Sequence, residues 1–184
     1  SSTGRLPALS ALMRELSTDR PDQTESPYTV DAGHLQWEID LVNYTYDRAN
    51  GVTTETLMLA PINFKLGLLN NVDVQFVVDS YVREKTRSAP LPSSKATGIG
   101  DLQTRLKVNL WGNDGGETAF AVMPFVKWPT ASSALSNGKV EGGVILPLGI
   151  SLGERFGLGV MTEVDFLRDV AGGDEQRPQL APAT

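Results

Sequence analysis

Seven segments of this chain alternate between apolar and polar residues with a period of two, the spacing of a β-strand with two different faces. In one of them, Leu106 and Val108 share one face while Arg105 and Lys107 share the other. Globular strands usually run five to six residues, whereas a tilted strand that crosses a bilayer needs about 9–11, and all seven segments are long enough. The segments are roughly 34–46, 54–69, 72–84, 101–111, 117–128, 140–152 and 156–168.

From the second connection onward, the connections between these segments are alternately short and long; the first connection, residues 48–52, is short as well. Residues 70–71, 112–116 and 153–155 form short connections, and residues 85–100 and 129–139 form long ones. Outer-membrane barrels have tight periplasmic turns at one end and long external loops at the other. The sequence therefore predicts an all-β fold, an antiparallel up-and-down β-barrel of the outer-membrane type in a bacterial outer membrane. Single-chain bacterial barrels have even strand numbers, so seven segments indicate a fragment of a longer barrel or a count that is off by one.

The two faces of the predicted strands differ in charge. Charges that are buried without partners in a dry core are costly, but in a wet lumen both signs can pair or remain hydrated. We therefore expect the apolar faces to contact lipid and the polar faces to line the barrel interior. The predicted lumen-lining residues are Glu38, Asp40, Lys65, Asp73, Asp79, Arg83, Arg105, Lys107, Glu163 and Asp165.

Aromatic residues gather near the ends of the predicted strands. Amphipathic rings settle at the headgroup level of a membrane, so two groups of this kind predict two aromatic girdles. Soluble barrels also carry aromatic residues at strand ends, and this alternative stays open. The predicted girdle residues are Trp37, Tyr44, Tyr46, Tyr81, Trp111, Trp128, Phe156 and Phe166.

Residues 1–33 form a polar lead-in before the first strand, expected in the periplasm, and residues 8–16 within it could form a short helix. Two interpretations of the lead-in remain open. Asp19, Arg20, Asp22 and Glu25 could fold back onto lumen charges as a small plug, or the stretch could be a solvated entry with no further role. Residues 169–184 are expected to be a polar loop or a truncated C-terminal segment. No start methionine precedes the chain, which reads as a processed or trimmed product.

Composition argues against several other functions. The net charge of −6 is unlike that of nucleic-acid-binding proteins, which cluster Lys and Arg. The absence of cysteine rules out disulfides and thiolate metal sites. His34 is the only histidine and no G-x-S-x-G motif accompanies it, so we expect no enzyme, metal or cofactor. An outer-membrane hydrolase that uses His34 is the weaker alternative.

Four stretches resemble a family of bacterial outer-membrane transporters named for the MetA pathway of phenol degradation. They are "STDRPDQTESPYTVDAGHLQWEIDLVNYTYDR", "LAPINFKLGLLNNVDVQFVVDSY", "GIGDLQTRLKVNLWG" and "AVMPFVKWPTA". The resemblance covers about residues 17–169. It implies an outer-membrane β-barrel that passes small molecules, with aromatic compounds suggested by the pathway association.

The functional expectation is a passive channel for small solutes, with membrane lipid and those solutes as its partners. Lys65, Arg105 and Lys107 could form a basic strip, and such a strip facing acidic residues would orient dipolar solutes in a constriction. The opposing acidic residues would be Asp73, Asp79, Glu163 and Asp165. A non-conducting barrel with a structural or binding role is the alternative, and the oligomeric state stays open.

Overall fold

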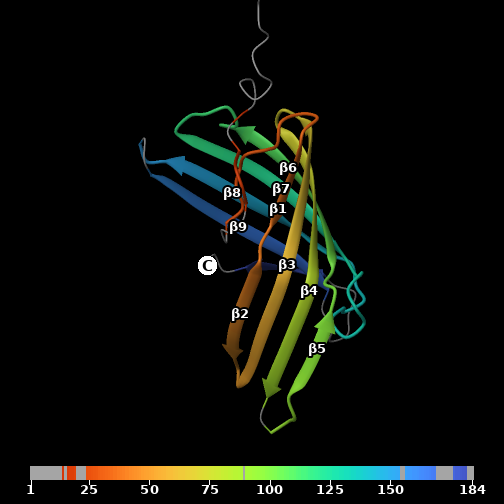
Figure 1. Cartoon of the computed structure of the whole chain (residues 1–184). Helices are drawn as coiled ribbons and strands as arrows, with labels where there is room; N and C mark the ends of the chain where they lie inside the picture. Colours follow the sequence, from red (N-terminus) through yellow and green to blue (C-terminus); the bar gives the residue numbers. More distant parts are fainter. Residues whose placement is uncertain are drawn as a thin grey trace, which may run out of the picture.

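The described residues of the computed structural model form one antiparallel sheet that curls into a half-barrel (Figure 1). These residues are 14, 16–19, 24–88, 90–153, 156–168 and 176–181. The strands within them are β1 (Leu35–Ile39), β2 (Val42–Ala49), β3 (Val52–Leu69), β4 (Val72–Ser88), β5 (Ser94–Gly98), β6 (Leu102–Trp111), β7 (Thr118–Trp128), β8 (Glu141–Ser151), β9 (Gly157–Arg168) and β10 (Gln176–Ala181).

The strand order confirms the predicted up-and-down topology. The sheet runs β1-β3-β4-β6-β7-β8-β9-β10, with β2 beside β3 and β5 beside β4. The pairings among these ten strands are all antiparallel, from β1 with β3 to β9 with β10. The chain is therefore all-β, with the curl of part of a β-barrel. No helix in the described part of the chain is long and apolar enough to cross a membrane.

The prediction of seven segments was wrong in three places, because the described residues contain ten strands. The first segment divides into β1 and β2 between Ile39 and Val42. The predicted long connection 85–100 contains the end of β4 and all of β5. The stretch at 85–98 is polar on both faces, so it carries no alternation to detect. Residues 176–181 of the expected C-terminal loop form β10, which pairs with β9.

The hairpin of β3 and β4 changes face partway along its length. Ala60 has a positive φ of 49°, next to Pro61, one of the prolines inside a predicted strand. Asp79 and Val82 of β4 line the same cavity although they are three residues apart. In a regular strand these two side chains would point to opposite faces. The alternation of inward and outward side chains therefore shifts by one residue near Ala60. Past this point, a count of every second residue continued from the hairpin turn leads to the opposite face of the sheet.

Four strands of the half-barrel carry polar side chains inward and apolar side chains outward. Lys65 of β3, Asp73 of β4 and Lys107 of β6 are each at most 2% exposed. The outward positions next to them carry residues such as Phe76 and Leu106, which are exposed. This arrangement is the reverse of a soluble protein, in which the apolar face of a sheet is covered.

The concave face of β7 and β8 is apolar instead. Met123, Phe125 and Ile145 are buried together there, and Met161 of β9 packs against them. The sequence did not predict this cluster, because β7 carries apolar residues on both faces and the alternation gives no inward side. The concave face thus has a charged half and an apolar half.

Candidate functional site

A short stretch of the lead-in lies inside the curl of the sheet (Figure 1). We call residues 16–19 and 24–31 the N-terminal segment. The amide of Gln36 in β1 donates to the Ser17 carbonyl oxygen at 2.9 Å. At the other side, a Cβ on Gly159 of β9 would lie 3.2 Å from the Thr24 hydroxyl oxygen. Because β1 and β9 are six positions apart in the sheet, a segment that reaches both must cross the concave face.

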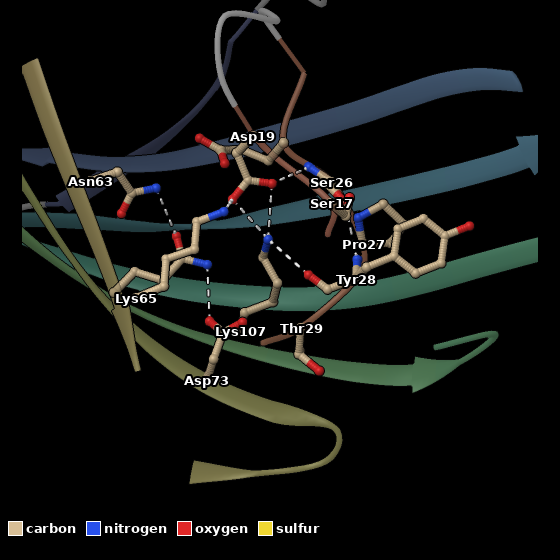
Figure 2. A network of polar contacts seen from close by, with 12 residues as sticks. Ser17, Asp19, Ser26, Pro27, Tyr28, Thr29, Asn63, Lys65, Asp73 and Lys107 are labelled. Atoms are coloured by element: carbon tan, nitrogen blue, oxygen red, sulfur yellow. Dashed lines mark hydrogen bonds and ion pairs between the residues drawn. The ribbon is translucent and has the colours of Figure 1, made fainter. Parts of the chain in front are cut away.

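Asp19 is the centre of the contacts between the N-terminal segment and the sheet (Figure 2). Lys107 Nζ donates to Asp19 Oδ1 at 3.1 Å and to Oδ2 at 3.0 Å. Lys65 forms an ion pair with Asp19 Oδ2 and a second one with Glu38 Oε1 at 2.5 Å. The Ser26 amide donates to Asp19 Oδ1 at 2.7 Å. One carboxylate of the segment therefore joins two lysines of the wall.

The electrostatic environment keeps the Asp19 carboxyl ionised. Burial by itself would raise the pKa of Asp19, but the charges of Lys107 and Lys65 outweigh it and hold the pKa well below its ordinary value. In a buried ion pair the low local dielectric strengthens the attraction, but both charges lose their hydration, so the net gain in stability is small. The clearer effect of such a pair is to favour one specific geometry. Asp19 accordingly fixes where the segment lies on the concave face.

Docking of the N-terminal segment is expected to weaken in acid. The folded pKa of Asp19 is lower than the unfolded one, so its contribution is present above the ordinary value of 3.8 and is lost as the pH falls below it. Pepsin should cut the segment faster as the pH falls from about 5 to about 2, relative to a free peptide of the same sequence. In Asp19→Asn this rise in the ratio of the two cleavage rates should disappear, because the remaining buried carboxyl of the segment, Glu25, has a raised pKa and favours the docked state as the pH falls. A constant ratio in the parent protein would contradict the assignment.

A second ion pair joins the N-terminal segment to β6. Arg105 Nη1 lies 2.5 Å from Glu25 Oε1, and Arg105 Nε donates to Gln103. The other carboxylate oxygen, Glu25 Oε2, is buried without a hydrogen-bond partner. Burial raises the pKa of Glu25, and the charge of Arg105 offsets this only in part. Glu25 is therefore a weaker anchor than Asp19.

The backbone of the N-terminal segment is held by side chains of the wall. Asn109 Nδ2 donates to the Pro27 carbonyl oxygen at 2.9 Å, and the Val30 amide donates to Asp73 Oδ2 at 3.0 Å. These contacts satisfy backbone groups that would otherwise be buried without partners. At the end of the segment the Asp31 carbonyl approaches Gly67 so closely that a Cβ there would lie 2.0 Å away.

These contacts agree with the plug interpretation of the lead-in. Asp19 and Glu25 fold back onto charged residues of the strands, as that interpretation expects. Arg20 and Asp22 lie outside the described residues, as does the predicted helix over 8–16 apart from Arg14 and Leu16.

The predicted lumen-lining residues fall into three groups. The first group lies in the contacts with the N-terminal segment: Glu38, Lys65, Asp73, Arg105 and Lys107. The second group is half-buried elsewhere: Asp40 between β1 and β2, Asp79 of β4, and Glu163 and Asp165 of β9. The third is Arg83 alone, which is exposed and lines a shallow surface pocket with Tyr44 and Leu57.

The structure places Arg83 away from the other predicted lumen residues. Tyr44 is itself a predicted girdle residue and is exposed. Arg83 follows the change of face near Ala60, so it has moved to the side opposite Asp79. Counting every second residue through this point put Arg83 on the wrong face.

All eight predicted girdle residues are exposed, and their arrangement in two bands stays a prediction. The structure adds an aromatic row that the sequence did not single out. The rings of Trp37 and Phe64 lie 4.8 Å apart between centroids, and those of Phe64 and Phe76 lie 6.3 Å apart. This row runs across β1, β3 and β4.

Uncharged polar residues of the concave face were missed by a search for charges. Gln75 donates to Asp73, and Asn63 donates to Gln75, so these amides connect the charged groups. Both are essentially buried. They share strand parity with Lys65 and Asp73, so extending the alternation to all polar residues would have found them.

The histidine and the acidic residues show no metal-binding grouping in the part of the chain that is described. His34 is exposed, with its Nδ1 at 3.1 Å from the Ala32 carbonyl oxygen. Within the described ranges, no group of three or more His, Asp or Glu residues is placed to hold a metal ion. The site's evident capacity is the binding of a carboxylate by two buried ammonium groups.

The comparisons with known proteins agree with this architecture. No curated protein and no solved structure matches the chain. A family model matches residues 18–181, which include most of the N-terminal segment and the strands from β1 to β10. The chain therefore belongs to the family described as "Putative MetA-pathway of phenol degradation".

Proposed function

We propose that this chain forms part of the wall of an outer-membrane β-barrel through which small solutes pass passively. The observation that carries the proposal is the reversed polarity of β1, β3, β4 and β6, with charged residues inside and apolar residues outside. The protein is then a channel rather than an enzyme. Its partners are membrane lipid and the solutes.

The outer face supports the membrane location. Large exposed apolar side chains gather on the convex side of β3, β4 and β6, as Leu68, Phe76 and Leu106 illustrate. Contiguous apolar surface on a folded protein marks contact with another apolar body. A barrel whose strands alternate between apolar outward and polar inward residues has lipid as that body.

The concave face supports passage of small solutes with both polar and apolar parts. An open cavity of about 470 Å³ is lined by Asp79, Gln103, Arg105 and Lys127 together with apolar groups such as Val77. The apolar cluster of β7 and β8 lies on the same side of the sheet. The family description mentions phenol, a small molecule with an apolar ring and a hydroxyl group, and such a solute suits this lining.

A specific observation favours the non-conducting alternative. The N-terminal segment crosses the concave face and fills the space between the lysines of β3 and β6. If the segment stays in place, the barrel has a structural or binding role instead. Conductance discriminates between the two functions.

The test uses the full-length protein in outer-membrane fractions. A closed membrane barrel resists detergent until it is heated, so its gel band is expected to shift on boiling. The purified protein should then give stepwise conductance in a planar bilayer. A soluble protein without a band shift would overturn the membrane location. A heat-shifted protein without conductance would support the non-conducting barrel.

A further inference from the structure

We infer that Lys65 and Lys107 form a carboxylate-binding site on the concave face, and that Asp19 occupies this site as an internal ligand. A small carboxylate solute takes the place of Asp19 and releases the N-terminal segment. The inference rests on the proposed function and gives it a solute class, namely small organic anions.

The geometry is that of a built anion site. Lys65 comes from β3 and Lys107 from β6, with β4 between them. Both ammonium groups nevertheless reach the same carboxylate, and Lys107 contacts both of its oxygens (Figure 2). Both side chains are almost completely buried. Charge-assisted hydrogen bonds of this kind are the strong ones in a protein interior.

Both acids of the wall near the site accept hydrogen bonds within the wall itself, Asp73 from Gln75 and Glu38 from Gln36 and Lys65. Asp73 stands opposite Lys107 in the strand register, but its oxygens accept from the Val30 amide at 3.0 Å and from Gln75 at 2.9 Å. Glu38 accepts from Lys65 and Gln36. Asp19 is thus the carboxylate that Lys107 contacts directly, and it comes from outside the sheet.

The N-terminal segment is attached in a way that allows exchange. The hydrogen bonds described above between the segment and the strands run through side chains, such as those of Asn109 and Gln36 with segment carbonyl oxygens. A strand of the sheet would instead lose a whole backbone ladder on leaving. Water and a polar solute can replace side-chain contacts one at a time.

The charge of the site selects an anion as the competitor. When Asp19 leaves, Lys107 loses the carboxylate that it contacts, and its ammonium group faces the hydrated concave face as an unpaired positive charge. A neutral solute cannot compensate for this loss, but a carboxylate can. Arg105, two residues from Lys107 on the same face of β6, lines the open cavity. A solute in that cavity is therefore next to the site.

The test measures whether a carboxylate releases the segment. Propionate is the probe, and propionamide is its neutral control of similar size. Residues 1–184 contain no cysteine, so Thr24→Cys gives one thiol that reports on the segment once any cysteine elsewhere in the full-length protein is replaced by serine. At about ten times its dissociation constant, propionate should raise the thiol-labelling rate about tenfold. Propionamide should leave the rate unchanged, and equal effects of the two probes would overturn the inference.

Two further variants locate the site. Asp19→Asn, added to Thr24→Cys, should label rapidly without any probe and should bind propionate more tightly, because the internal competitor is gone. Lys107→Gln should lose propionate binding, with the heat shift confirming that the barrel is folded. Unchanged propionate binding in Lys107→Gln would overturn the assignment.

Labelling does not depend on conductance, so the two proposals fail separately. A protein that responds to propionate but does not conduct would overturn the channel and keep the carboxylate site. A conducting protein in which propionate has no effect would overturn the site and keep the channel.

Discussion

Oxidation of a Thr24→Cys/Gly159→Cys double variant is expected to abolish channel opening, and a thiol reductant is expected to restore it. The Thr24 Cβ lies 3.9 Å from the position that a Cβ would take on Gly159. Disulfides join Cβ atoms about 3.5–4.5 Å apart. The bridge would fix the N-terminal segment to β9 while Asp19 is in contact with the two lysines. Planar-bilayer recordings before and after reduction measure the effect on one sample.

The matched control for this lock is Thr24→Ser/Gly159→Ser. It introduces side chains of similar size that cannot form a bridge, so its conductance should be the same under oxidising and reducing conditions. Residues 1–184 contain no cysteine, and any cysteine elsewhere in the full-length protein is replaced by serine in both variants, so no other thiol contributes to the response. If the oxidised double cysteine variant conducts as well as the reduced one, the segment does not obstruct the pore.

Strand alternation was sufficient to predict the fold class. Residues such as Lys65 and Lys107 can be assigned to the inward face because their neighbours Phe64 and Leu106 are apolar. The sequence shows this contrast directly. The topology followed from the spacing of the connections. Period-two reasoning is reliable where one face is apolar and the other polar.

The same reasoning failed where that contrast is missing. The end of β4 and all of β5 are polar on both faces, so residues 85–98 were taken for part of a loop. Ala60 changes the phase of the alternation through its backbone conformation, which displaced Arg83. In β7, apolar residues on both faces hid the inward cluster around Met123.

The partners of Asp19 could not be predicted from the sequence. The lead-in is rich in charges, and the wall offers several lysines and arginines as partners. The pairing of Asp19 with Lys65 and Lys107 depends on where the curl of the sheet brings β3 and β6 together. Local sequence patterns carry no information about how close β3 and β6 come in the folded sheet. Both interpretations of the lead-in, the plug and the solvated entry, therefore stayed open.

The contribution of this carboxylate to docking can be measured by hydrogen exchange. Asp19→Asn removes the negative charge between two buried lysines. Breaking a buried ion pair by removing one partner costs about 3–5 kcal/mol of stability. The sheet need not unfold to relieve this cost, since release of the N-terminal segment hydrates both lysines. The stability lost in Asp19→Asn therefore cannot exceed the free energy with which the N-terminal segment docks on the sheet.

Exchange of the segment amides in Asp19→Asn should accelerate by roughly 10²-fold, while that of β3 and β4 should stay unchanged. The matched control is Asp114→Asn, because Asp114 also forms an ion pair, in its case with Arg14, but its side chain is 85% exposed. Exposed ion pairs contribute little to stability. In Asp114→Asn the amides of the N-terminal segment should therefore exchange at the same rate as in the parent protein. Adding Lys107→Met to Asp19→Asn removes the orphaned charge and should recover part of the protection. Acceleration spread over β3 and β4 would mean that Asp19 stabilises the whole sheet rather than the plug.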